Sequence, residues 1–191
     1  MAGISGGADS VCLLFVLKNL CEELGDVLFQ VMLNSQIAKE KGLEPLANTL
    51  MEQKLSVSAL EEAAGYINDD KEVKTAEDAL AGAADIIAEA ISDTADYRTR
   101  IRDLTMEKGR LTSTAKDPEA ESVYEMYYEF DEALSKVAGH RTLAINRGEK
   151  EKILTVKIEA PVDDIIAYLK KKVITNDNPN TNDVLAGAIE D

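Results

Sequence analysis

Apolar residues recur at three- and four-residue steps along most of this 191-residue chain, and this spacing strongly limits its fold. The clearest case runs through Leu80, Ala83, Ile87 and Ile91. These residues share one face of an α-helix, because a helix turns once in 3.6 residues. A half-buried strand would instead place apolar residues at every second position. We therefore predict a mainly α protein, built as a multi-helix bundle.

Helix start signals of the capping-box form precede two segments. Ser58 is followed by Glu61, and Thr75 by Asp78. In each pair the hydroxyl can accept from a free amide while the acid reaches back to the cap. We expect a short helix after Ser58 and a long one after Thr75, with residues 97–106 as the long helix's returning partner. Further helices are predicted over residues 43–50, 162–173 and, after an Asn-rich loop at 176–183, from residue 184 onward.

Two short segments, residues 110–114 and 153–158, have the composition and alternation of β-strands. We expect them to pair as a minor two-stranded β-ribbon. Between them lies a group of aromatic residues that could stack on nucleic-acid bases, although core packing is the favoured interpretation at this spacing. The group consists of Tyr124, Tyr127, Tyr128 and Phe130.

The charge of the chain narrows the class of protein. There are 36 acidic and 21 basic residues, and the formal net charge is −15. The electrostatic field of such a negative chain repels phosphate backbones and anionic lipids unless basic groups gather on one face of the protein. No apolar run approaches the roughly 20 residues of a spanning helix, and no basic residue precedes the first apolar run as in a secretory signal. We expect a cytoplasmic protein with no membrane partner.

Few residues suggest chemistry. His140 is the single histidine and has no cysteine near it in sequence, so a zinc site of the usual ligands would be incomplete, and we predict a structural role. Cys12 and Cys21 are nine residues apart, on opposite faces of a helix. We interpret the acidic pairs at residues 69–70 and 163–164 as solvated surface residues and not as groups for acid–base catalysis. We predict no enzymatic activity, no cofactor and no metal.

Near its start the chain reads SGGADS, followed by an apolar helical pattern that stops near Gly25. This stretch resembles the PP-loop of the ATP pyrophosphatases and, more closely, the start of the tRNA isoleucine lysidine synthetases. The resemblance implies an ATP site made by backbone amides and a helix N-terminus. Only four residues precede the loop, too few for a supporting strand, so an ATP-binding enzyme fragment is the alternative interpretation. The implied nucleotide-binding residues are Ser5, Gly6, Gly7, Asp9 and Ser10.

Four later stretches resemble bacterial Tex proteins, which are transcription accessory factors. In order they read IAKEKGLEPLA (37–47), AEDALAGAADIIAE (76–89), HRTLAINRGE (140–149) and DVLAGAIED (183–191). Together the two resemblances imply a PP-loop-like segment over residues 1–36, forming a helix and a short apolar run, and a Tex-like helical region over residues 37–191, truncated at its C-terminus. In that family the nuclease-like, helix-hairpin-helix and OB-fold RNA-binding domains would follow Asp191. The resemblance to Tex proteins therefore implies that this region is a non-catalytic scaffold of a nucleic-acid-binding protein. An acidic protein–protein interaction module is a further alternative.

Between His140 and Lys172 the local charge is reversed, with eight basic and five acidic residues. Weak RNA or DNA contact is predicted here. Arg141 and Arg147 are six residues apart and point to different faces of a helix, so we expect one of them in an internal salt bridge, for example with Glu149 or with an acid of a neighbouring helix. Gly148 marks a helix end or a close contact. The candidate nucleic-acid-binding residues are Arg141, Arg147, Lys150, Lys152, Lys170, Lys171 and Lys172.

The sequence also predicts protein partners. One is the set of Tex domains that the resemblance places after this region. Another is a second copy of the chain, because the apolar helix that follows the SGGADS loop must bury its stripe either on the bundle or on itself. The second arrangement would give a homodimer through the N-terminal helix.

Overall fold

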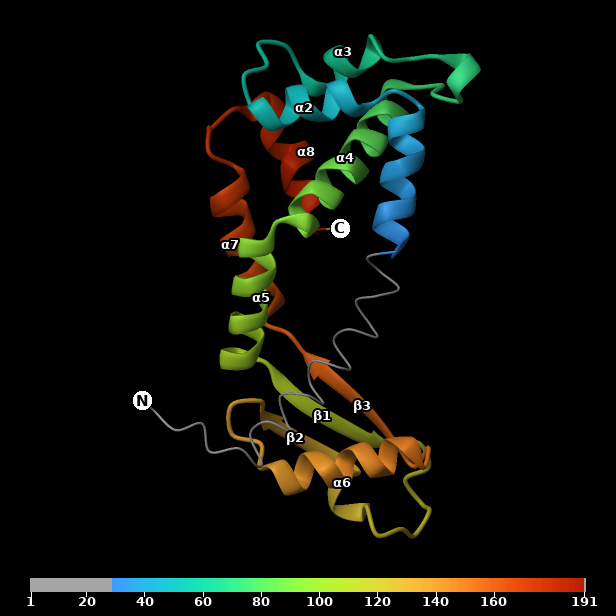
Figure 1. The fold of residues 1–191 in the computed structure, drawn as a ribbon, viewed down its shortest axis with the longest axis vertical. Helices are drawn as coiled ribbons and strands as arrows, with labels where there is room; N and C mark the ends of the chain where they lie inside the picture. The colour runs from blue at the N-terminus through green and yellow to red at the C-terminus, as the bar shows by residue number, and fades with distance from the viewer. Residues whose placement is uncertain (1–28, 191) are drawn as a thin grey trace. The chain divides into compact units, whose positions relative to one another are not determined.

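The structure, a computed structural model, describes residues 29–190, and the chain divides into two compact units (Figure 1). Of the described residues, the sheet unit holds 101–162, and the helical unit holds 29–100 and 163–190. The chain passes between them within α5 (Ala95–Lys108) and at the start of α7 (Val162–Val173). The boundary predicted at residues 36 and 37 falls within a helix over residues 29–40.

The helical unit is organised around α4 (Ala76–Asp93), which packs against α2 (Glu44–Glu52), α3 (Ala59–Ala64) and α8 (Pro179–Glu190). Its fully buried side chains include Leu46, Leu50, Ile87 and Leu185. They come from three helices and lie at the helical spacing that the sequence shows, because each helix buries one stripe. The prediction of a mainly α fold is confirmed.

Both predicted capping boxes are formed. The Glu61 amide donates to the Ser58 hydroxyl at 3.2 Å, and the Asp78 amide donates to the Thr75 hydroxyl at 3.1 Å. In return each acid accepts from the backbone amide of its cap. These bonds occupy amides that have no partner within the helix, so they fix where α3 and α4 begin.

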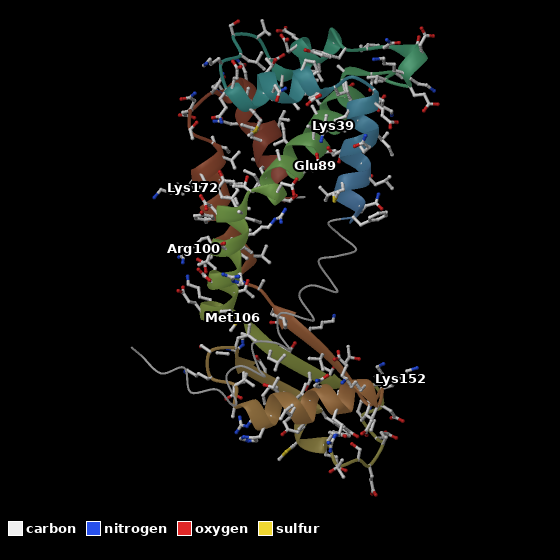
Figure 2. The ribbon with its side chains drawn as sticks, viewed as in Figure 1. Lys39, Glu89, Arg100, Met106, Lys152 and Lys172 are labelled. Carbon is white, nitrogen blue, oxygen red and sulfur yellow. The ribbon has the colours of Figure 1, made fainter. Side chains whose placement is uncertain are left out.

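Polar bonds to Glu89 and a close apolar approach at Gly82 hold the helix over residues 29–40 against α4. The hydroxyl of Ser35 donates to Glu89 Oε2 at 2.8 Å, and the Lys39 ammonium bonds the same oxygen (Figure 2). Beside this contact Gly82 faces Leu43 and Ala38, and a β-carbon at Gly82 would lie 2.5 Å from Leu43 Cδ1. Glycine at this position allows the close approach.

The connection between α7 and α8 is fixed by Gln53, which is only 5% exposed. Its side-chain amide donates to the Val173 carbonyl at 2.7 Å, and its Oε1 accepts from the amides of Thr175 and Asn176 at 3.0 and 2.9 Å. In turn the side-chain amide of Asn178 donates to the backbone carbonyl of Gln53 at 3.2 Å. One residue after α2 therefore orders a loop more than a hundred positions later.

The sheet unit contains the antiparallel order β2–β1–β3, formed by β1 (Arg110–Ala115), β2 (Glu129–Ala133) and β3 (Leu154–Glu159). α6 (Gly139–Lys150) contacts the sheet through β3 (Figure 1). The buried cluster joins the sheet to α6 and to the turn η2 (Glu125–Tyr127): Leu111, Tyr124, Tyr127, Leu134, Val137, Ile145, Leu154 and Val156. Core packing of the aromatic group is confirmed, since Tyr128 and Phe130 also pack against this cluster.

Three predictions of structure need correction. β1 and β3 pair as expected, but β2 makes the ribbon a three-stranded sheet. α8 begins at Pro179 rather than at residue 184, because proline suits the first turn of a helix. Residues 97–106 are helical, yet α5 is not a returning partner of α4: it buries only Leu104 and Thr105, and its second half belongs to the sheet unit.

Candidate nucleic-acid interface

The C-terminal turn of α6 carries two exposed basic side chains, Arg147 and Lys150, which are three residues apart on the helix. The helix is held close to the sheet here because Gly148 is buried and a β-carbon on it would lie 2.7 Å from Leu154 Cδ1. The prediction that Gly148 marks a close contact is confirmed. This packing fixes the position from which Arg147 and Lys150 project into solvent.

The chain leaves α6 through a tight turn that adds a third basic residue. The amide of Lys152 donates to the Glu149 carbonyl at 2.9 Å, and the amide of Ile153 donates to the Gly148 carbonyl at 2.9 Å. Lys152 adopts the left-handed conformation, with φ of 62°, and its side chain is exposed. β3 then begins at Leu154.

The sheet register brings in a fourth basic residue that sequence reasoning missed. Ala115 at the end of β1 pairs with Leu154, and the amide of Lys116 donates to the Ile153 carbonyl at 2.9 Å. The exposed Lys116 therefore follows the strand that lies beside the turn. Pairing between the two predicted strands was the available signal, but their register was not. We call Lys116, Arg147, Lys150 and Lys152 the basic turn; none of them forms an ion pair that is identified among the described residues.

Two acidic residues, Glu149 and Glu151, lie between these basic residues in the sequence, and Glu151 interacts with a buried tyrosine. The side chain of Tyr124 hydrogen-bonds to Glu151. Burial raises the pKa of Tyr124 above its usual value, and the hydrogen bond and the negative charge of Glu151 raise it further, while Arg147 opposes the shift. Glu151 and Arg147 therefore act in opposite directions on the same phenol.

Arg141, at the other end of α6, is used within the unit. Its guanidinium donates to Glu132 Oε2 on β2 at 2.8 Å. The predicted internal salt bridge is confirmed, although the acid is on a strand and not on a neighbouring helix. The neighbouring His140 is exposed and lines a small hollow with Met126, Tyr127, Phe130 and Arg141. The structure therefore shows no buried structural role for this histidine.

The remaining candidates, Lys170, Lys171 and Lys172, lie in the last turn of α7 within the helical unit. Lys170 is paired with Glu190 of α8 at 2.5 Å, whereas Lys171 and Lys172 are exposed. The predicted basic set is thus divided between the two units. The nucleotide-binding set at residues 5–10, both cysteines and the predicted N-terminal helix lie outside the described residues.

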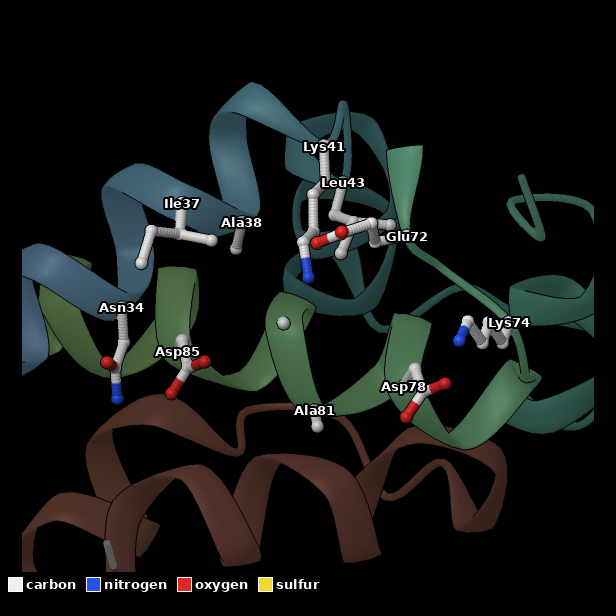
Figure 3. A pocket seen from close by; sticks show the side chains of 11 residues that line it. Asn34, Ile37, Ala38, Lys41, Leu43, Glu72, Lys74, Asp78, Ala81 and Asp85 are labelled. Atoms are coloured by element: carbon white, nitrogen blue, oxygen red, sulfur yellow. The ribbon is translucent and has the colours of Figure 1, made fainter. Parts of the chain in front are cut away.

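The helical unit has a pocket of about 510 Å³ between the helix over residues 29–40 and α4 (Figure 3). Two lysines, Lys41 and Lys74, line it together with the carboxylates of Glu72, Asp78 and Asp85. Asp78 accepts from the Thr75 amide, so it belongs to the capping box of α4. The pocket is therefore lined by charges of both signs.

Residues 29–190 contain no group of three or more His, Cys, Asp or Glu side chains placed to hold a metal ion. Within the same residues no helix is both long enough and apolar enough to cross a membrane.

Comparison with protein families gives two matches that do not overlap. Residues 54–183 match the model described as Tex central region-like. Residues 16–52 match the model of the MazG nucleotide pyrophosphohydrolase domain. The resemblance to the PP-loop is not supported, since the N-terminal match is to a different family.

Curated relatives match most of the chain. A Bacillus subtilis protein named YdcI is 46% identical over 158 residues, which are 81% of this chain and 22% of that protein. The Transcriptional accessory protein Tex of Neisseria gonorrhoeae is 32% identical over 134 residues, 68% of this chain and 17% of the relative. The human S1 RNA-binding domain-containing protein 1 is 30% identical over 65% of this chain and 13% of its own length. The chain therefore spans about a fifth or less of these relatives.

Proposed function

This chain belongs to the Tex central region-like family, and on that premise we propose that it is a non-catalytic helical scaffold of a Tex-like nucleic-acid-binding protein. The names of two relatives support this proposal, because one is called a transcriptional accessory protein and another is named for an S1 RNA-binding domain. The remaining domains of such a protein would be the partners of this region in a longer chain.

We propose that the scaffold touches nucleic acid weakly, through the basic turn of the sheet unit. The observation that carries this proposal is that Arg147, Lys150, Lys152 and Lys116 are all exposed at one end of α6 and β3. Lysine and arginine bind phosphate oxygens with little regard to sequence. A chain with a net charge of −15 can approach a phosphate backbone only where cations gather locally.

The size of the effect follows from counterion release. For four phosphate contacts on a single strand, a rise from 50 to 200 mM salt lowers the affinity by about 50-fold. Contact of this kind is weak at physiological salt. It positions a nucleic acid that other parts of a longer protein bind, and it carries no sequence preference of its own.

Fluorescence anisotropy with a labelled single-stranded RNA at about 50 mM salt tests the proposal. The variant R147Q/K150Q/K152Q should weaken binding at least tenfold and flatten the salt dependence. The matched control K170Q/K171Q/K172Q removes the same number of charges in the helical unit and should stay within about threefold of the unaltered chain. Equal losses in both variants would show that only net charge matters, and no binding at all would leave a scaffold without nucleic-acid contact.

The match over residues 16–52 favours one second candidate, hydrolysis of a nucleotide. Incubation of the chain with nucleoside triphosphates and Mg²⁺ separates the two candidates. Our proposal requires that no pyrophosphate is released above the rate of a blank. Release that scales with protein concentration would replace the non-catalytic scaffold by a MazG-like activity.

The homodimer through the helix that follows the SGGADS loop stays a prediction, because that helix lies outside the described residues. The described part of the chain offers a different surface for contact with a second copy. The helix over residues 29–40 exposes Phe29, Met32, Leu33 and Ile37, an apolar stripe at helical spacing. Light scattering should show a mass that rises with protein concentration if this stripe meets a second copy. The variant M32K/L33K should then remain a monomer at all concentrations, and a strictly monomeric unaltered chain would contradict the prediction.

A further inference from the structure

Two of the most exposed apolar side chains in the described residues are three positions apart in the sequence of the sheet unit. Val123 is 86% exposed and Met126 is 75% exposed, and both belong to the segment between β1 and β2. Tyr124 between them is only 5% exposed, and Tyr127 after them is buried as well. The segment therefore turns Tyr124 and Tyr127 into the core while it presents a valine and a methionine side chain to solvent.

Hydrogen bonds to the backbone on both sides of Met126 hold this residue in its exposed position. The buried hydroxyl of Ser113 on β1 donates to the Tyr127 carbonyl at 2.6 Å. The hydroxyl of Tyr128 donates to the Ala120 carbonyl at 2.5 Å, and the Tyr124 amide donates to the Ser122 hydroxyl at 3.0 Å. Because these bonds hold the chain on both sides of Met126, a partner would not have to order this segment on binding.

A hollow of about 440 Å³ lies beside Met126, at the lower end of the range for small-ligand pockets. Pro118, Tyr128 and Met126 provide its apolar lining. Glu125 and Glu129, four residues apart, contribute the carboxylates. Both acids are exposed, and neither forms an ion pair that is identified among the described residues, whereas Asp131 and Glu132 are paired with Arg110 and Arg141.

The charge around the hollow decides what kind of partner fits. Residues 117–132 contain seven acidic side chains and no basic one. Asp131 and Glu132 are paired with Arg110 and Arg141, and Lys116 lies just before the segment, but the other five acids leave a net negative charge that disfavours phosphate here. A basic peptide has the complementary charge, and its apolar side chains would find the exposed Met126 and Val123.

We propose that this surface, formed by Val123, Met126, Glu125 and Glu129, docks a basic, amphipathic peptide segment of a partner protein. An apolar side chain of the segment fills the hollow against Met126 and Tyr128. A lysine or arginine next to it reaches Glu125 and Glu129, where arginine can bond a carboxylate through two parallel N–H groups. The proposal goes beyond the nucleic-acid contact and uses none of the residues of the basic turn.

The test is fluorescence anisotropy with the full chain and a labelled twelve-residue peptide in which leucine alternates with lysine and arginine. A second peptide carries serine in place of every leucine and has the same charge. We expect the leucine peptide to bind at least tenfold more tightly than the serine peptide. Equal binding of both peptides, or no binding of the leucine peptide, would overturn the proposal.

Variants of the chain locate the site. M126S should weaken binding of the leucine peptide about tenfold, and E125Q/E129Q should weaken it and reduce its dependence on salt. The matched controls M51S and E40Q/E77Q change exposed residues of the helical unit and should bind as the unaltered chain does. If M126S and E125Q/E129Q also bind as the unaltered chain does, the surface is not the docking site.

RNA binding distinguishes this proposal from the proposed function. M126S should bind RNA as the unaltered chain does, and R147Q/K150Q/K152Q should retain its affinity for the leucine peptide. Loss of both activities in either variant would show that a single surface serves both ligands, which contradicts the proposal. Circular dichroism confirms that each variant keeps its helix content.

Discussion

Replacement of Gln53 by alanine should destabilise the helical unit substantially, because one side chain makes three hydrogen bonds to the connection between α7 and α8. Thr175 and Asn176 are exposed, so their amides can bond water instead, and each loss amounts to about 1 kcal/mol. Val173 is buried, and leaving its carbonyl without a donor costs about 1–3 kcal/mol. We expect a total of about 3–5 kcal/mol.

Two further variants separate the hydrogen bonds from the backbone conformation. Gln53 has φ of 54°, a left-handed conformation that glycine adopts more readily than other residues by about 1 kcal/mol. Q53G should therefore be about 1 kcal/mol more stable than Q53A, yet still less stable than the unaltered chain. The control Q36A changes an exposed glutamine and should lie within about 0.5 kcal/mol of the unaltered chain.

Urea unfolding followed by circular dichroism measures these differences, and amide exchange at Thr175 and Asn176 reports the loop itself. In Q53A both amides should exchange faster than those of α4. The reasoning would be refuted if Q53A unfolded at the urea concentration of the unaltered chain, or if Q53G were less stable than Q53A.

Three other perturbations have expected outcomes. G82A should lower the midpoint of thermal unfolding, because its β-carbon would lie 2.5 Å from Leu43 and such overpacking costs about 1–3 kcal/mol. A β-carbon at Gly187 on α8 would meet nothing within 4 Å, so G187A should raise the free energy of unfolding by about 0.5–1 kcal/mol. Hydrogen bonds from Lys39 and Ser35 lower the pKa of Glu89. The ionised Glu89 therefore contributes fully to stability above pH 4.5, the ordinary pKa of the group, and this contribution is lost as the pH falls through the lowered pKa. The stability curves of the unaltered chain and of E89Q should converge at acidic pH. Because burial raises the pKa of Tyr124, folding favours the neutral phenol, and the unaltered chain should lose stability relative to Y124F as the pH rises above 10.

Helices were predictable from sequence where their signals are local. The capping boxes at Ser58 and Thr75 set the start of α3 and α4 within the sequence itself, and both formed. β2 was not predicted, because Glu129–Ala133 has three acids among its five residues and acids are uncommon in strands. Pairing with β1 makes it a strand, and that pairing is a tertiary effect.

The candidate site was predictable only in part, because its local basic composition is visible in the sequence whereas its tertiary contacts are not. The local excess of basic residues pointed to α6 and α7, but sequence could not show that Glu132 would engage Arg141 or that Glu190 would engage Lys170. Those acids come from other elements, so only the fold reveals them. Lys116 likewise joins the basic turn through strand register, which single-sequence patterns leave open.

The central claim, that the scaffold meets nucleic acid at the basic turn, is tested most directly by NMR titration of the isotope-labelled chain with single-stranded RNA at low salt. We predict that the amide signals of residues 147–153 and of Lys116 shift first and furthest, and that salt reverses the shifts. Shifts centred on Lys171 and Lys172, or an unchanged spectrum at saturating RNA, would contradict the account.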